Sequence, residues 1–148
     1  MQEVSTLTEF IVSTRLVFWG DQLAPQHLAK ILGLDFSLCL MFKKGDAHHK
    51  DNKNAQTSRE KTGKLIYEYR REQPTAERNP EVQLSFFSDL LTKLPSDFAK
   101  KYNVDLSEFQ MSIYYGDLAP GEPDFFIPCD FLARLSSHQI RFCITVLP

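Results

Sequence analysis

The sequence has few of the residues that mark special classes of protein. Its 148 residues include only six glycines and three cysteines, and 43% are hydrophobic against 24% charged, as in an ordinary globular domain. The cysteines Cys39, Cys129 and Cys143 are odd in number and widely spaced, which excludes a disulfide framework and a zinc motif. No apolar run reaches the roughly 18–20 residues of a membrane span. We therefore expect one cytoplasmic α+β domain over residues 1–148, with no membrane partner and no cofactor.

Motifs that carry catalysis are also missing. There is no phosphate-binding glycine loop, no nucleophile elbow and no HExxH pair. His48-His49 with Asp51 comes nearest to a metal site, but no second ligand pair lies at a suitable spacing. Cys39 and Cys143 lie in apolar runs, where a thiol packs as a small hydrophobic group in the core. The sequence indicates no metal site and no catalytic residue, and we expect a protein that is not an enzyme.

Charge is distributed unevenly, although the net charge is only −2. The segment 43–64 holds seven basic and three acidic residues, a net of +4, which leaves −6 for the rest of the chain. Between residues 45 and 63 there is no large aliphatic or aromatic side chain, so we expect a mobile basic loop about 45–63. The loop lacks interleaved aromatic residues and the remaining surface is acidic, which argues against nucleic-acid binding. An acidic body would instead attract a basic protein.

Hydropathy patterns predict an alternation of strands and helices. The strongest helix signal follows Asn79-Pro80-Glu81, where Asn can cap and Pro suits the first turn, and Pro95 should kink or split this helix after Leu94. The resulting order β-α-β-β-α-β-α-β predicts an α+β fold with a sheet packed against helices. The predicted elements are strand 10–19, helix 25–33, buried strand 36–42, strand 64–69, the helix from residue 80, strand 109–115, helix 128–137 and strand 140–147.

Two stretches of the sequence echo one another. Phe18-Trp19-Gly20-Asp21 is matched by Tyr114-Tyr115-Gly116-Asp117, and an Ala-Pro pair follows each run. The two halves would then form a pseudo-repeat, with both Gly-Asp turns at one edge of the sheet. The alternative is that Gly-Asp is common turn chemistry. A repeat would also bring Asp21 and Asp117 together as an acid–base pair, although turn stabilisation accounts for both carboxylates.

Aromatic residues near acidic ones indicate a partner-binding edge. Aromatic anchors inside a polar rim are typical of such surfaces. The alternative is that Phe125 and Phe126 only fasten a proline-rich loop to the core. The candidate partner-binding residues are Trp19, Asp21, Tyr114, Tyr115, Asp117, Glu122 and Asp124.

Four local signatures accompany this order of elements. They are a first strand ending in Phe18-Trp19-Gly20-Asp21, the helix from Pro25 to Leu34 with its Leu-Gly-Leu exit, the Lys44-Gly45-Asp46 turn, and the closing helix and strand from Leu132 to Leu147. Together they resemble the bacterial family known as domain of unknown function 4279. The resemblance covers the chain from about Phe10 onward and brings no established activity with it.

Small acidic cytoplasmic domains of this kind are similar to the immunity proteins that accompany bacterial toxins. The resemblance implies a protein that binds a cognate toxin domain, basic and nuclease-like, and blocks its active site. One alternative is a small-molecule or peptide-binding module with a deep pocket lined by Trp19, Tyr114 or Tyr115. Another is a hydrolase, which requires the Asp21 and Asp117 carboxylates to lie within about 5–10 Å of each other.

Overall fold

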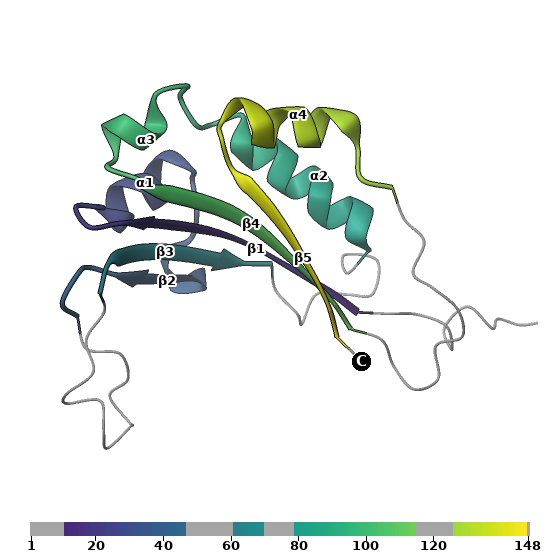
Figure 1. Ribbon diagram of the computed structural model, residues 1–148, viewed down its shortest axis with the longest axis horizontal. Coiled ribbons are helices and arrows are strands. Elements are labelled where there is room, and N and C mark those ends of the chain that lie inside the picture. The colour runs from purple at the N-terminus through teal and green to yellow at the C-terminus, as the bar shows by residue number, and fades with distance from the viewer. Residues whose placement is uncertain (1–10, 47–60, 70–78, 115–125, 148) are drawn as a thin grey trace, which may run out of the picture.

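A long central strand organises the structure. The computed structural model describes residues 11–46, 61–69, 79–114 and 126–147, and within them the α+β prediction is confirmed (Figure 1). The elements are β1 (Ile11–Gly20), α1 (Pro25–Ile31), the 3-10 helix η2 (Phe36–Leu38), β2 (Cys39–Phe42), β3 (Gly63–Glu68), α2 (Pro80–Leu91), α3 (Phe98–Lys101), β4 (Leu106–Tyr114), α4 (Cys129–Ser137) and β5 (Arg141–Leu147).

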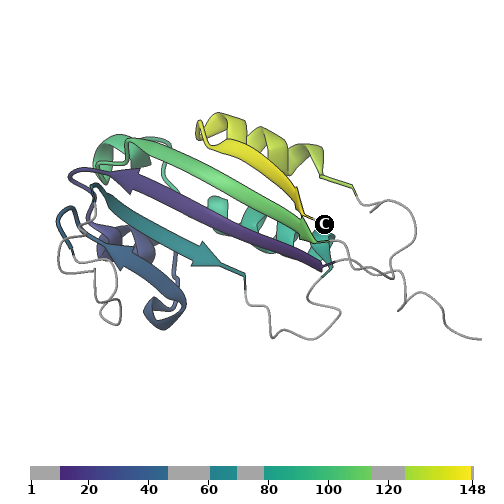
Figure 2. The same ribbon diagram turned by 60° about the horizontal axis from the view of Figure 1, so that its bottom comes forward.

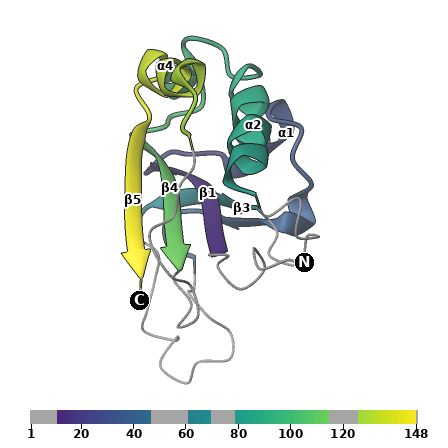
Figure 3. The same cartoon turned by 90° about the vertical axis from the view of Figure 1, so that its right-hand side faces the viewer.

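The five strands form one mixed sheet in the order β2-β3-β1-β4-β5. β1 pairs antiparallel with both β3 and β4, and β2 pairs antiparallel with β3. β5 runs parallel to β4, because α4 carries the chain back before β5 begins. The α-helices all lie on one side of the sheet (Figures 1 and 3).

The core lies between that side of the sheet and the helices. Alternate residues of β1, namely Val12, Leu16 and Phe18, point into it and are at most 4% exposed. A chain of aromatic rings crosses the layer, from Phe87 on α2 to Phe109 on β4 and Phe131 on α4, with centroids 5.0 Å apart at each step. Edge-to-face rings at this separation add to the free energy gained by burial.

Helix α2 begins where the sequence predicts and ends a few residues before the predicted division after Leu94. The Asn79 side chain accepts a hydrogen bond from the Glu81 amide at 2.8 Å, and Pro80 takes the first helical position. Pro95 cannot continue the helix, so α2 ends at Leu91 and α3 starts at Phe98.

The prediction of a buried strand over residues 36–42 is wrong in two respects. Its first half is η2, because the Asp35 carboxylate accepts hydrogen bonds from the Ser37 amide and hydroxyl at 3.0 and 2.8 Å. Its second half, β2, is an edge strand in which Leu40 is 58% exposed. An apolar run carries no information on whether its strand has a neighbour on both sides.

A buried polar contact ties α2 to β1. Gln83 is 2% exposed and Thr14 is fully buried. The Thr14 hydroxyl donates to Gln83 Oε1 at 2.5 Å, and Gln83 Nε2 donates to the Val12 carbonyl at 3.1 Å. This contact fixes the position of the helix along the strand, because any shift would leave polar groups unpaired in an apolar layer.

Gln83→Leu should lower the free energy of unfolding by about 1–3 kcal/mol, since it leaves the Thr14 hydroxyl without its acceptor. Gln83→Leu combined with Thr14→Val should cost less than the sum of the two single changes. Urea denaturation of the four proteins in a double-mutant cycle measures the coupling. A coupling near zero would show that the contact does not hold the helix in place.

Candidate partner-binding face

The side of the sheet turned away from the helices carries the candidate site. Figure 2 shows this side with the strands in front of the helices. We call it the open face, and the strand register places the following residues on it. They are Leu40 and Phe42 of β2, Lys64, Ile66 and Glu68 of β3, Ser13, Arg15, Val17 and Trp19 of β1, Leu106, Glu108, Gln110, Ser112 and Tyr114 of β4, and Arg141, Cys143, Thr145 and Leu147 of β5.

Apolar side chains gather at one corner of the open face. The register aligns Phe42, Lys64, Trp19 and Leu106 in one row across four strands. The next row aligns Leu40, Ile66 and Val17. Val17 is 1% exposed, so its neighbours cover it, whereas Leu40 is 58% exposed. We call the set Val17, Trp19, Leu40, Phe42, Ile66 and Leu106 the apolar corner.

A charged network occupies the middle of the open face, centred on Glu108. Glu108 is only 9% exposed and forms an ion pair with Arg141 at 3.3 Å. Gln110 Nε2 donates to Glu108 Oε1 at 2.6 Å, and Arg15 Nε donates to Gln110 Oε1. The network joins β1, β4 and β5, so its polar groups are held in place before any partner arrives.

The pKa of Glu108 is lowered. Burial acts to raise it, but the hydrogen bonds from Gln110 and Cys143, together with the positive charges of Arg141 and Arg15, outweigh burial. Glu108 therefore stays ionised, and the pKa of the Cys143 thiol is raised by burial and by the hydrogen bond and charge of Glu108.

The prediction that both strand cysteines pack in the core is correct for one of them. Cys39 points to the helix side and packs against the core. Cys143 lies on the open face beside Glu108 instead. An apolar run does not reveal which of its residues faces the core.

Acidic side chains border the apolar corner where β1 ends and β4 begins. The Asp21 amide donates to Asp105 Oδ2 at 3.1 Å, and the Asp105 amide donates to the Trp19 carbonyl at 2.7 Å. The Asp21 carboxylate forms an exposed ion pair with Lys44 at 3.4 Å. Asp105 thus stabilises the turn after Trp19, while the Asp21 carboxylate is turned to the hairpin of β2 and β3.

Beside this turn lies an open pocket of about 560 Å³. It is lined by Asp21, Gln22, Ala99, Lys100, Asn103, Val104 and Asp105. Neither Trp19 nor Tyr114 lines it, in contrast to the pocket that a small-molecule module would require. Its walls are mostly polar and widely open to solvent, which does not suit a buried ligand.

Close backbone contacts explain the glycine after Trp19. Gly20 lies opposite Gly63 in the register. A Cβ on Gly20 would lie 2.1 Å from the Asn103 carbonyl oxygen, and a Cβ on Gly63 would lie 2.7 Å from the Gly20 carbonyl oxygen. Both obstructing atoms belong to the backbone, which cannot swing aside as the end of a flexible side chain can.

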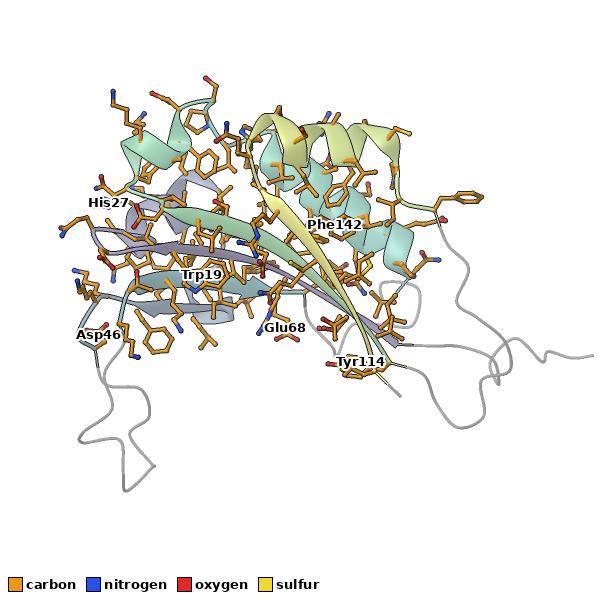
Figure 4. All side chains as sticks on the ribbon, in the orientation of Figure 1. Trp19, His27, Asp46, Glu68, Tyr114 and Phe142 are labelled. Carbon is orange, nitrogen blue, oxygen red and sulfur yellow. The ribbon has the colours of Figure 1, made fainter. Side chains whose placement is uncertain are left out.

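The structure separates two of the residues predicted to form one partner-binding edge. Trp19 is opposite Leu106, whereas Tyr114 is opposite Ile11 at the far end of β1 (Figure 4). The two positions on β1, Ile11 and Trp19, are eight residue steps apart, which is about 26 Å along an extended strand. Trp19 and Asp21 therefore belong to the apolar corner and its rim, and Tyr114 belongs to the opposite end of the open face.

Several expectations fall outside the described residues. They are the partner-binding residues Tyr115, Asp117, Glu122 and Asp124, the carboxylate pair of Asp21 with Asp117, the second half of the sequence echo, the His48-His49-Asp51 group and most of the basic loop. Sequence reasoning also missed residues that the sheet assembles, namely Leu40, Phe42, Ile66, Leu106 and Asp105. For Ile66 the alternation over residues 64–69 is a signal, because Ile66 falls between Leu65 and Tyr67, which face the core.

Comparisons with protein-family models, curated proteins and solved structures found no match. Within the four described ranges, no group of three or more His, Cys, Asp or Glu side chains could hold a metal ion. In the same ranges, no helix has the length and apolarity needed to cross a membrane.

Glu108→Gln should reveal how much the charged network stabilises the fold. A carboxyl whose pKa is lowered by folding stabilises the protein above its unfolded pKa, and the contribution is lost as the pH falls through the folded pKa. We expect a loss of about 1–2 kcal/mol at pH 7 that shrinks toward zero below the ordinary value of 4.5. Chemical denaturation at several pH values measures it. Asp89→Asn, an exposed change on α2, is the control, and an equal loss there would contradict the role of Glu108.

Gly20→Ala should destabilise the fold far more than an exposed Gly-to-Ala change, because the added methyl group meets the Asn103 backbone. We expect a loss of about 2–4 kcal/mol in thermal or urea denaturation. Gly45→Ala is the comparison at an uncrowded glycine, where the positive φ of 94° alone opposes alanine. Similar losses for both variants would show that crowding at Gly20 is relieved cheaply.

Proposed function

We propose that this protein is a non-enzymatic binding protein, an immunity protein that binds a cognate bacterial toxin domain and blocks its active site. The observation that carries the proposal is the open face. Aromatic and aliphatic side chains stand there beside fixed charges, and the helices of the described chain all lie on the other side (Figure 2).

The size of the open face supports a separate protein partner. The five strands contain 10, 4, 6, 9 and 7 residues, and with about 3.3 Å per residue and about 4.8 Å between strands they define an area of roughly 600 Å². A specific complex of standard size buries about 800 Å² on each partner, whereas obligate interfaces are larger and more apolar. The open face, half apolar and half polar, fits the first class.

The open face has an apolar part, which is the apolar corner, and a charged part around Glu108. The apolar corner supplies Trp19, a residue type that is enriched among the side chains contributing most to binding free energy, and exposed aliphatic groups such as Leu40 that can exclude water around it. Arg15 and Arg141 stand beside it, held by Glu108 and Gln110, and can fix the orientation of a partner. Preorganised polar groups lose little entropy on binding.

The charge pattern bears on the kind of partner. The open face itself carries three basic and two acidic side chains, so the acidic surplus lies elsewhere. Asp21 and Asp105 border the Trp19 end, next to the apolar corner. We infer that a basic, nuclease-like toxin is steered by the acidic rim and then docks on the apolar corner.

The thiol chemistry supports a role without catalysis. Burial, followed by the charge of Asp35, raises the pKa of Cys39 to about 11, and the pKa of Cys143 is also raised. At neutral pH both thiols are protonated, and a protonated thiol is a poor nucleophile. Neither residue is suited to start a covalent reaction.

Co-expression with the product of the neighbouring gene tests the proposal, with co-purification followed by calorimetry. Leu40→Lys, which places a charge in the apolar corner, should raise the dissociation constant at least tenfold, which corresponds to a loss of about 1.4 kcal/mol of binding free energy. Ile31→Lys, at a 41% exposed residue of α1 on the helix side, is the matched control and should not change it. If no protein from that locus binds tightly, the proposed function is wrong. If both variants weaken binding equally, the open face is not the binding surface.

A further inference from the structure

β5 is an edge strand with a continuous free edge. It is last in the sheet order, and no described helix or strand lies beyond it (Figure 3). Its pairing with β4 runs without a bulge from Arg141 to Leu147. Its other edge therefore presents a regular row of backbone N–H and C=O groups that has no neighbour among the described strands.

The two edges of the sheet are built differently. β2 has four residues, follows the 3-10 helix η2 and is succeeded by the Lys43-Lys44 pair, so it offers a short and interrupted edge. β5 has seven residues, no proline or glycine, and one charged residue, Arg141, at its start. The features by which proteins usually protect an edge strand are thus present in β2 and missing from β5.

Exposed aliphatic side chains follow the β5 edge. Ile144 is 50% and Val146 is 56% exposed, although both point to the helix side of the sheet. Leu132 of α4 is 40% exposed. Arg134 of α4 points toward α2, because it donates a hydrogen bond to the Ser88 carbonyl there at 2.9 Å. Leu132 precedes Arg134 by two residues, which is about 200° around a helix. Leu132 therefore lies on the flank of α4 opposite α2, above the free edge of β5.

We propose that β5 pairs antiparallel with β5 of a second copy of this chain, joining two sheets into one of ten strands. With the two-fold axis at Ile144, each Ile144 faces the other, Phe142 faces Val146, and Cys143 faces Thr145. The exposed aliphatic residues of the two copies then cover one another, and the α4 flanks that carry Leu132 come side by side.

The strand sequence suits a second copy in particular. In this register each Arg141 faces a Leu147, and the two arginines stand at opposite ends of the ladder, about 20 Å apart, so they do not repel closely. A ladder of seven residues buries less than the roughly 800 Å² per partner of a stable complex. The dimer therefore forms and dissociates with concentration, and both open faces remain free for the toxin.

Sedimentation velocity over a range of concentrations tests the proposal on the wild-type protein. The apparent mass should rise toward twice the monomer mass, and Ile144→Lys, which sets two charges against each other, should remain monomeric. Leu40→Lys is the matched control, since Leu40 lies on the opposite edge strand and is more exposed. Circular dichroism checks that each variant is folded.

A cysteine cross-link tests the register. In a protein with Cys39, Cys129 and Cys143 changed to serine, Ile144→Cys should form a covalent dimer under mild oxidation, and Leu40→Cys should not. A wild-type protein that stays monomeric up to its solubility limit overturns the proposal. So does a dimer that Ile144→Lys leaves intact or that Leu40→Lys dissociates. No toxin enters these measurements, so their failure would leave the proposed function standing.

Discussion

The rest of the structure depends on the antiparallel pairing of β1 with both β3 and β4. Because side chains alternate along a strand, this pairing sends Leu16 and Phe18 to the helices and Arg15 and Val17 to the other side. The helices pack over Leu16 and Phe18 and bury them. Arg15 and Val17 form the open face together with side chains of the neighbouring strands. The core and the candidate site are therefore built on the two sides of the same strand.

Much of the fold is readable from local signals. The capped start of α2, the division at Pro95 and the alternation of β1 depend on neighbours within one or two turns, and each appears where it is predicted. The candidate site depends on which strands become neighbours, which hydropathy does not encode. Leu40 is exposed because β2 is an edge, and Cys143 meets Glu108 because β5 lies beside β4. Tyr114 and Trp19 share sequence character but lie at opposite ends of paired strands.

The sequence gives the net charge of each segment but not where the charged side chains lie on the folded surface. Counting along the chain separates a +4 segment from a −6 remainder. Among the described residues outside 43–64, however, seven basic residues stand against nine acidic ones, so most of that surplus comes from segments beyond the described ranges. On the open face the arrangement of charges matters more than their sum: Arg141 pairs with the buried carboxylate of Glu108 directly, and Arg15 is linked to it through Gln110. Net charge affects how fast a partner associates, whereas fixed charges of this kind affect which partner can bind and in which orientation.

The order of strands also has a consequence during synthesis. β1 is made first, but its partners are residues 63–68 and 106–114, much later in the chain. At roughly 5–20 residues per second, β1 waits several seconds before both of its edges can be paired. A strand carrying Phe18, Trp19 and Leu16 with open edges is a target for chaperones and for wrong pairing in that interval. The speed of translation between β1 and β4 therefore bears on how much chain reaches the folded state, independently of how stable that state is.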